Sequence, residues 1–344
     1  MQDLTAYDDL FTNPAWFLRG FDGDQAMFTF VRTREPVIRQ SAFLDGRTPI
    51  SVDDRILQVP ADAAIAWVQT TAHTQVPDRI IAHISFCGST LLGRLLQGDG
   101  HALGYSEPHV LVELATLKAK QHPLSVDAEQ WRALLRFVLM QYRKAWDENA
   151  TFIKPSNWVN TLLADLIDAS PKLKWAIIDT DLEDYLIANL RGGKARLQYS
   201  LNLLNHFLSA NQTYRAQVLD VERAKLEPVQ RLLRLLMIVY ETQQRLLECA
   251  IEQARGDICR ISKAELQSDP TASLAKIARG LELMLPRDGA ASAISREMGQ
   301  HAKDTSLEFR PDIEAAENIR LRRELDTAFN QALDWRETNL RSVA

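Results

Sequence analysis

The sequence has few cysteines, no long apolar run and no surplus of positive charge, and each absence excludes a class of protein. The chain of 344 residues has three cysteines, an odd number without metal-ligand spacing, which is typical of a reducing compartment. No stretch approaches the roughly 20 apolar residues of a membrane span. The formal net charge of −5 gives no indication of a basic surface for nucleic acid or for an anionic membrane.

These absences predict a cytoplasmic protein with no nucleic-acid or membrane partner. The opening residues, Met1 to Phe11, are acidic and contain no apolar segment of signal-peptide length. An apolar fraction of 46% with 25% charged residues is that of an ordinary globular protein, and 344 residues suffice for one large α/β domain or two small ones. The oligomeric state stays open, and a homodimer is one option.

The chain is organised around residues 79–96. An apolar run of strand length, Ile80 to Ile84, is interrupted at Cys87-Gly88. Leucines at 91, 92, 95 and 96 then share one helical stripe, which predicts a helix that starts at Ser89. A buried strand, a tight glycine turn and a helix start form an anion site, because the first amides of the helix have no internal partner and its dipole favours negative charge.

An ATPase-type phosphate loop is the first interpretation to consider for this stretch. Gly88 and Gly93 have the required spacing, but Arg94 and Leu95 stand where that loop has Lys and Ser/Thr. The Lys that reaches the terminal phosphates and the hydroxyl that holds Mg²⁺ are therefore missing, and the predicted helix already includes Gly93. We predict that the site uses no metal.

The segment Phe-Cys-Gly-Ser-Thr-Leu-Leu resembles the 5′-phosphosulfate-binding loop of the P-loop sulfotransferases, written R/K-S-G-S/T-T-L-L. The resemblance implies 3′-phosphoadenylyl sulfate (PAPS) as the sulfuryl donor. Phe86 stands in place of the basic residue that opens the family loop. The alternative is an ordinary strand–turn–helix without a ligand. The residues that the resemblance assigns to phosphosulfate binding are Cys87, Gly88, Ser89, Thr90 and Leu91.

Two further segments resemble elements of the bacterial sulfotransferases. Ser106-Glu107-Pro108 corresponds to S-x-E-P and makes Glu107 a candidate general base; alternatively, Glu107 caps the helix expected near His109. Lys154-Pro155-Ser156-Asn157 corresponds to K-P-S/T-N and implies that Lys154 faces the nucleotide. We expect the loss of Lys154 to weaken nucleotide binding and to leave the melting temperature of the unliganded protein nearly unchanged.

A third segment departs more from the family pattern. Asp184 matches an Asp of the sulfotransferase element R-D-P-x-D, but Thr180 replaces the Arg and Ala188 replaces a later Ser, the two residues that bind the 3′-phosphate in the family. Arg191 and Lys194 are candidates to supply the missing positive charge. The alternative is a helix end at Gly192-Gly193 with solvated neighbours.

From residue 79 onward, strands alternate with helices, which predicts a three-layer α/β fold with a mainly parallel sheet and many helices. We expect residues 1–75 to form a small N-terminal cap with short strands at 27–31 and 41–44, and residues 76–344 to form the α/β domain. One C-terminal helix is expected from Ile313 to about Asn339. His301-Ala302-Lys303 resembles the H-S-K element that lies near the nucleotide in the family.

The function that the resemblance implies is the transfer of a sulfuryl group from PAPS to a hydroxyl or amine of a small molecule. In this interpretation Glu107 deprotonates the acceptor, and Lys154 neutralises the oxygen that leaves. A nucleotide phosphotransferase or hydrolase of the wider P-loop class is one alternative. A non-catalytic P-loop scaffold for binding is another, favoured by Phe86, Thr180 and Ala188.

Overall fold

The computed structural model describes most of the chain. Its ranges are residues 4–71, 77–98, 102–121, 126–147, 150–254, 258–285, 294–295, 297, 300–301, 304–308 and 311–341.

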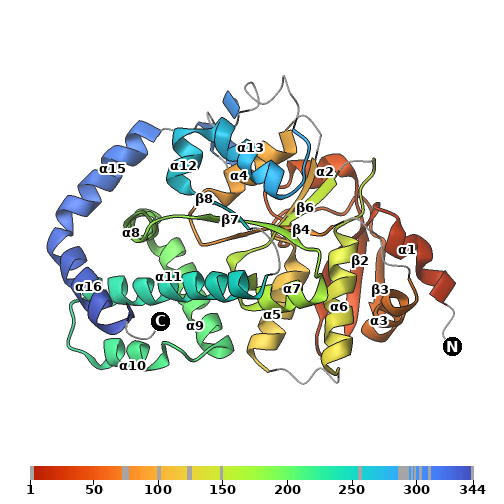
Figure 1. Cartoon of the computed structure of the whole chain (residues 1–344), viewed down its shortest axis with the longest axis horizontal. Helices are drawn as coiled ribbons and strands as arrows, with labels where there is room; N and C mark the ends of the chain where they lie inside the picture. Colours follow the sequence, from red (N-terminus) through yellow and green to blue (C-terminus); the bar gives the residue numbers. More distant parts are fainter. Residues whose placement is uncertain are drawn as a thin grey trace.

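Five parallel strands form the central sheet, in the spatial order β5-β6-β4-β7-β8 (Figure 1). The middle strand β4 is buried at every residue, as expected for an apolar run that is covered on both faces. The strand at 79–83 and the parallel sheet, both predicted from the sequence, are confirmed. The strands are β4 (Arg79–His83), β5 (Ala102–Ser106), β6 (Ala150–Lys154), β7 (Lys174–Asp179) and β8 (Cys259–Ser262).

Helices cover both faces of this sheet, which confirms the three-layer prediction (Figure 1). One face carries α4 (Ser89–Gln97), α12 (Lys263–Ser268) and α13 (Pro270–Gly280). The helix predicted to start at Ser89 does so, with Gly93 inside it. The other face carries η3 (Asn157–Leu162), α5 (His109–Ala119), α6 (Ala128–Gln141), α7 (Leu163–Ala169), α9 (Gly193–Ala210) and α11 (Pro228–Gln253).

The N-terminal region contains a second, antiparallel sheet in the order β1-β2-β3. The strand expected at 27–31 is present, but the one expected at 41–44 is wrong. That segment instead hydrogen-bonds across to the parallel sheet: the Leu44 amide donates to the Ser106 carbonyl (2.7 Å). The elements are η1 (Leu4–Tyr7), α1 (Asp8–Thr12), β1 (Trp16–Asp22), β2 (Met27–Arg32), α2 (Glu35–Gln40), β3 (Ile56–Pro60) and α3 (Ala61–Thr70).

The expected single C-terminal helix is two helices, α15 (Pro311–Glu324) and α16 (Asp326–Asn339). The break at Leu325 lets α15 pack on α8 (Leu182–Arg191) while α16 packs on α11, so the two helices cover different neighbours (Figure 1). Arg336 of α16 pairs with Glu241 of α11 (Nε–Oε1, 2.6 Å). The remaining elements are α10 (Arg215–Arg223), β9 (Gln300–His301) and β10 (Asp304–Glu308).

Two further predictions can be compared with the described residues. Of the His301-Ala302-Lys303 segment, His301 belongs to β9, and the other two residues lie outside the described residues. None of the helices in the described ranges has the length and apolar character needed to cross a membrane.

Candidate functional site

The carboxyl ends of the parallel strands bring several of the predicted site residues together. From β4 the chain passes to one side of the sheet for β5 and β6, and then crosses to the other side for β7 and β8. Ligands of open α/β sheets bind where the strand order reverses in this way, outside the carboxyl ends of the strands. The loop after β4, Glu107 after β5 and Lys154 at the end of β6 all lie at this edge.

The loop between β4 and α4 has the geometry of an anion site. Gly88 has φ +89° and precedes the helix as its N-cap, a conformation that glycine adopts without strain. Glycine offers no side chain to cap α4, so the amides of the first helical turn have no side-chain acceptor from the N-cap. Ser89 and Thr90 are buried against this turn, and Leu91 is half-buried.

Cys87 is the first of the predicted loop residues, and its thiol is not reactive in this setting. The side chain is fully buried, and burial raises the pKa of the thiol to about 11, against the opposing effect of nearby Ser89. A neutral, buried thiol is a poor nucleophile. What Cys87 can offer a ligand is therefore its backbone.

A buried polar network beneath the loop fixes its position. The Ser85 amide donates to Gln243 Oε1 (3.0 Å), and Asn157 Nδ2 donates to the same oxygen (2.9 Å) and to the Ser85 hydroxyl. The Tyr199 hydroxyl donates to Asn157 Oδ1. Of these residues on the helical side, the sequence singled out only Asn157. Gln243 and Tyr199 lie on the long helices α11 and α9, where no local sequence pattern sets them apart from ordinary core or surface residues.

Glu107 and Lys154, the two predicted catalytic residues, form an ion pair with each other (Nζ–Oε1, 2.6 Å). The Lys154 side chain is 0% exposed and that of Glu107 is 16% exposed. Both positions are held by the backbone, since the Glu107 amide donates to the Lys154 carbonyl (2.6 Å). Glu107 has φ +54°, which is strained for a residue with a side chain.

This geometry changes two expectations drawn from the sequence. Glu107 does not cap α5, whose N-cap is Pro108 without a side-chain capping bond. For the loss of Lys154, the structure predicts lower stability and not the unchanged melting temperature expected from the sequence, because a wholly buried, paired ammonium cannot be removed without affecting its carboxylate partner.

The N-terminal region adds two residues to the site that the sequence did not indicate. The Phe43 ring lies 5.6 Å from Lys154 Nζ, and the Arg47 guanidinium lies 4.1 Å from the same ring. Arg47 also approaches Glu107 (Nη2–Oε2, 3.7 Å) and pairs with Asp45. Nothing in the local sequence indicated that Phe43 and Arg47 would meet residues 60 or more positions later in the chain.

His83, at the end of β4, is a further titratable group, close enough to Lys154 and Glu107 to be affected by their charges. Its Nδ1 lies 2.9 Å from the Ile84 carbonyl oxygen, and its Nε2 lies 2.9 Å from that of Pro155. Burial, followed by the charge of Lys154, lowers the pKa of His83 to about 4. The ring is therefore neutral at pH 7 and supports the strand ends rather than carrying charge.

The other charged residues predicted for the site are paired with other parts of the chain or exposed. Asp184 pairs with Lys263 of α12 (2.9 Å), and Arg191 pairs with Glu314 of α15 (2.7 Å). Lys194 is exposed on α9. Both charged partners of Asp184 and Arg191 come from elements far along the chain, so the sequence could not show that these charges are already balanced.

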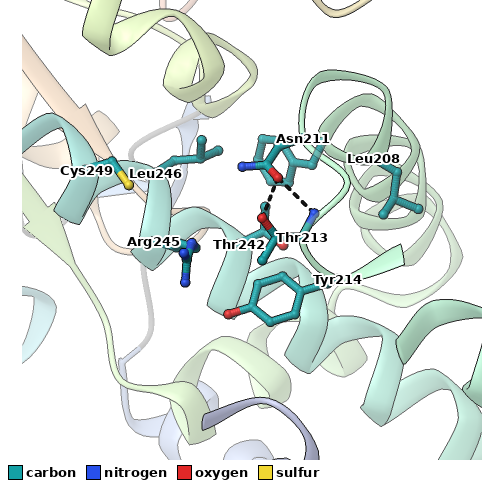
Figure 2. Close-up of a pocket in the computed structure, with 9 residues that line it drawn as sticks. Leu208, Asn211, Thr213, Tyr214, Thr242, Arg245, Leu246 and Cys249 are labelled. Carbon is teal, nitrogen blue, oxygen red and sulfur yellow. Dashed lines mark hydrogen bonds between the residues drawn. The ribbon is translucent and has the colours of Figure 1, made fainter. Parts of the chain in front are cut away.

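Two surface features elsewhere differ in their capacity for ligands. Beside α11, Asn211, Thr213, Arg245 and Cys249 help to line a cavity of about 20 Å³, which has room for little more than one water molecule (Figure 2). The Asn211 side chain is held there by the amide and hydroxyl of Thr213 (Figure 2). A groove of about 550 Å³ lies between α9 and α10, and its lining mixes leucines with polar and charged side chains. Within the described ranges, no group of three or more His, Cys, Asp or Glu side chains could hold a metal ion.

No family model matches the chain, and no curated protein gives a significant match. Three similar solved structures are bacterial or biosynthetic sulfotransferases. A sulfotransferase domain from the curacin biosynthetic pathway has 14% identity and a TM-score of 0.45, and the match covers 69% of this chain and 84% of that one. A sulfotransferase from Mycobacterium avium has 10% identity and a TM-score of 0.39, with 78% and 81% covered. One from Alicyclobacillus acidocaldarius has 17% identity and a TM-score of 0.33, with 75% and 93% covered. At these TM-scores the likeness carries no argument about activity or substrate.

Proposed function

We propose that the protein transfers a sulfuryl group from PAPS to a hydroxyl or amine of a small molecule. The observation that carries this proposal is the buried Glu107–Lys154 pair, which lies at the carboxyl ends of β5 and β6. Of these two strands, β6 pairs directly with β4, the strand that leads into the anion loop. Sulfuryl transfer needs a base, a cation and an anion-binding loop, and this edge of the sheet offers all three.

The residues present fit the donor molecule. The amides at the start of α4, together with the hydroxyls of Ser89 and Thr90, would hold the phosphosulfate, because a helix start without a side-chain cap favours an anion. The hydroxyl of Thr180, at the end of β7, is buried and has no hydrogen-bond partner among the described residues. A bound nucleotide that reached this oxygen would satisfy it.

Glu107 would act as the base. It would accept the proton of the acceptor hydroxyl or amine while the acceptor oxygen or nitrogen forms its bond to sulfur. The bond between sulfur and the bridging oxygen would break in the same step, and the electron pair would stay with the phosphate of the leaving 3′,5′-ADP. The left-handed backbone at Glu107 is consistent with this role, because strained backbone conformations cluster at active sites, where the surrounding structure maintains them.

Lys154 would stabilise the negative charge that develops on the bridging oxygen. Its ammonium is shielded from water, so its electrostatic effect on a nearby oxygen is larger than at a surface. Without ligands the same ammonium is balanced by Glu107. Binding of the anionic donor would give Lys154 a second negative partner and free Glu107 to accept a proton.

A binding scaffold is the second candidate function. It is favoured by the apolar side chain of Phe86 in the loop and by the fact that the candidate base and cation neutralise each other. A scaffold would use the same amides to hold an anionic ligand and would carry out no transfer.

The test is the thermal stability of the protein with three ligands: 3′,5′-ADP, ATP, and ATP with Mg²⁺. We expect 3′,5′-ADP to raise the melting temperature in the absence of metal, because a ligand that binds only the folded state stabilises it by mass action. Stabilisation by ATP only with Mg²⁺ would favour a phosphotransferase. No shift with any of the three would contradict the proposal. Transfer of labelled sulfate from PAPS to a panel of phenols and amines then separates the enzyme from the scaffold.

A further inference from the structure

Arg196, in the first turn of α9, brings a positive charge to the anion loop. Its guanidinium carbon lies 5.2 Å from the centroid of the Phe86 ring, and its Nη1 donates to the Ala188 carbonyl (2.9 Å). The Phe86 ring also packs against Tyr185 of α8 (6.0 Å between centroids). A cation therefore lies beside the loop at Phe86, the position where the sulfotransferase loop that this segment resembles has a basic residue.

The chain makes room for this arginine at Gly192. A Cβ atom at that position would lie 1.8 Å from Arg196 Cδ, far inside any contact distance. The backbone of Gly192 (φ −72°, ψ −2°) is one that any residue adopts. The turn therefore does not require glycine at position 192. The missing side chain instead leaves the space that the Arg196 side chain occupies.

The charge of Arg196 is only partly compensated in the unliganded protein. Within the part of the chain that the structure describes, Arg196 forms no ion pair with a carboxylate, whereas neighbouring Arg191 pairs with Glu314 (2.7 Å). Burial lowers the pKa of Arg196 and the charge of Arg191 lowers it further, while the charge of Glu314 acts in the opposite direction. A half-buried cation with a like charge nearby, close to the positive end of α4, is stabilised when an anion binds.

We propose that Arg196 is the phosphate-binding cation of this site, in place of the basic side chain that the loop lacks at Phe86. The inference rests on the proposed function and specifies its ligand class: a nucleotide is held for the charge of its phosphates. The stacking of guanidinium on the Phe86 ring keeps the planar group oriented, which suits a fork-like contact with phosphate oxygens.

The experiment is titration calorimetry with 3′,5′-ADP and, as an uncharged probe, adenosine. Arg196→Ala should weaken 3′,5′-ADP binding by roughly ten- to a hundredfold, the loss expected when one charged phosphate contact is removed. Arg196→Lys should keep part of the affinity. Gly192→Ala, which displaces the side chain without removing it, should weaken 3′,5′-ADP binding in the same direction. Adenosine should bind all variants equally.

Arg234 of α11 offers a matched control. Its guanidinium carbon lies 5.2 Å from a Trp335 ring centroid, and burial lowers its pKa as it does for Arg196. Arg234→Ala removes the same kind of stacked arginine and should leave 3′,5′-ADP affinity unchanged.

The outcomes are distinguishable. If wild type binds 3′,5′-ADP and Arg196→Ala binds it equally well, the inference is wrong and the proposed function stands. If wild type binds no nucleotide, the proposed function fails and the inference fails with it. Equal losses for 3′,5′-ADP and adenosine would assign Arg196 a structural role and overturn the inference. Should Arg196→Ala not fold, Arg196→Gln, which retains the stem over Phe86, gives the same comparison.

Discussion

The two ends of the parallel sheet each bury an ion pair, and the pairs differ in how fully their charges are satisfied. At the amino end, Asp78 accepts from Arg143 through both carboxylate oxygens (2.6 and 3.0 Å) and also from the Ser170 hydroxyl (2.5 Å). At the carboxyl end, Lys154 Nζ lies 2.6 Å from Glu107 Oε1, and Arg47 Nη2 lies 3.7 Å from Glu107 Oε2.

This difference indicates which end of the sheet is built for ligands. A carboxylate with three short donors is satisfied by the protein alone and is typical of a structural pair. A fully buried ammonium that, among the described residues, pairs with one carboxylate oxygen can accept another anion. The orphan Thr180 hydroxyl and the partly compensated Arg196 lie on the carboxyl side of the strands as well. The candidate site is therefore distinguished by buried polar and charged groups that the protein satisfies only in part, and not by the presence of charge alone.

The largest expected effect is on transfer at the carboxyl end. Glu107→Gln should lower turnover by roughly 10²–10⁴, the contribution of a general base. Binding of 3′,5′-ADP should stay nearly unchanged, because the amide still accepts from Lys154. Single-turnover transfer and calorimetry on one preparation measure both. Unchanged turnover would mean that Glu107 only balances the charge of Lys154.

The amino end should respond with a loss of stability instead. Asp78→Ala leaves the half-buried Arg143 and the Ser170 hydroxyl without their acceptor and should lower the free energy of unfolding by about 3–5 kcal/mol. Urea unfolding measures the change. The folded fraction should bind 3′,5′-ADP as wild type does. A loss of affinity without a loss of stability would reverse the assignment of the two ends.

The carboxyl end should also be sensitive to acid through His83. Because the folded pKa of about 4 is lower than the ordinary 6.5, the unfolded chain binds a proton first as the pH falls. Stability from this group is complete above pH 6.5 and is lost as the pH falls to 4, by on the order of 3 kcal/mol. Urea unfolding at both pH values should show a shallower pH dependence in His83→Gln. Equal slopes would mean that His83 titrates normally.

The smallest expected effect concerns how the Glu107–Lys154 pair is balanced. Lys154→Met should weaken 3′,5′-ADP binding by roughly ten- to a hundredfold, as expected for the loss of one phosphate contact. It should also lower stability, because Glu107 loses its short contact with the buried ammonium of Lys154. Adding Glu107→Gln should restore the free energy of unfolding to within about 1 kcal/mol of wild type, since replacing both members of a buried pair is often neutral. No recovery in the double variant would show that the two residues act independently.

The sequence by itself determined the framework of the fold. The apolar run from Ile80 to Ile84 and the leucine stripe after Ser89 are local patterns, and the structure has both the strand and the helix. Such patterns can be read because burial repeats with the period of the strand or helix. The N-terminal region was read less well: the segment at 41–44 bonds to the end of β5 rather than forming a strand, a choice made by a partner far away in the chain.

Only the tertiary structure decided how charge is distributed at the site. Glu107 and Lys154 are 47 residues apart in sequence, and no local pattern states that they meet. Arg196 contacts Phe86 across a sequence separation that includes the three strands β5, β6 and β7, and its position depends on the missing side chain of Gly192. Periodicity reports which face of an element is buried, but electrostatic balance depends on distances between elements, and those distances exist only once the sheet and its two helical layers have formed.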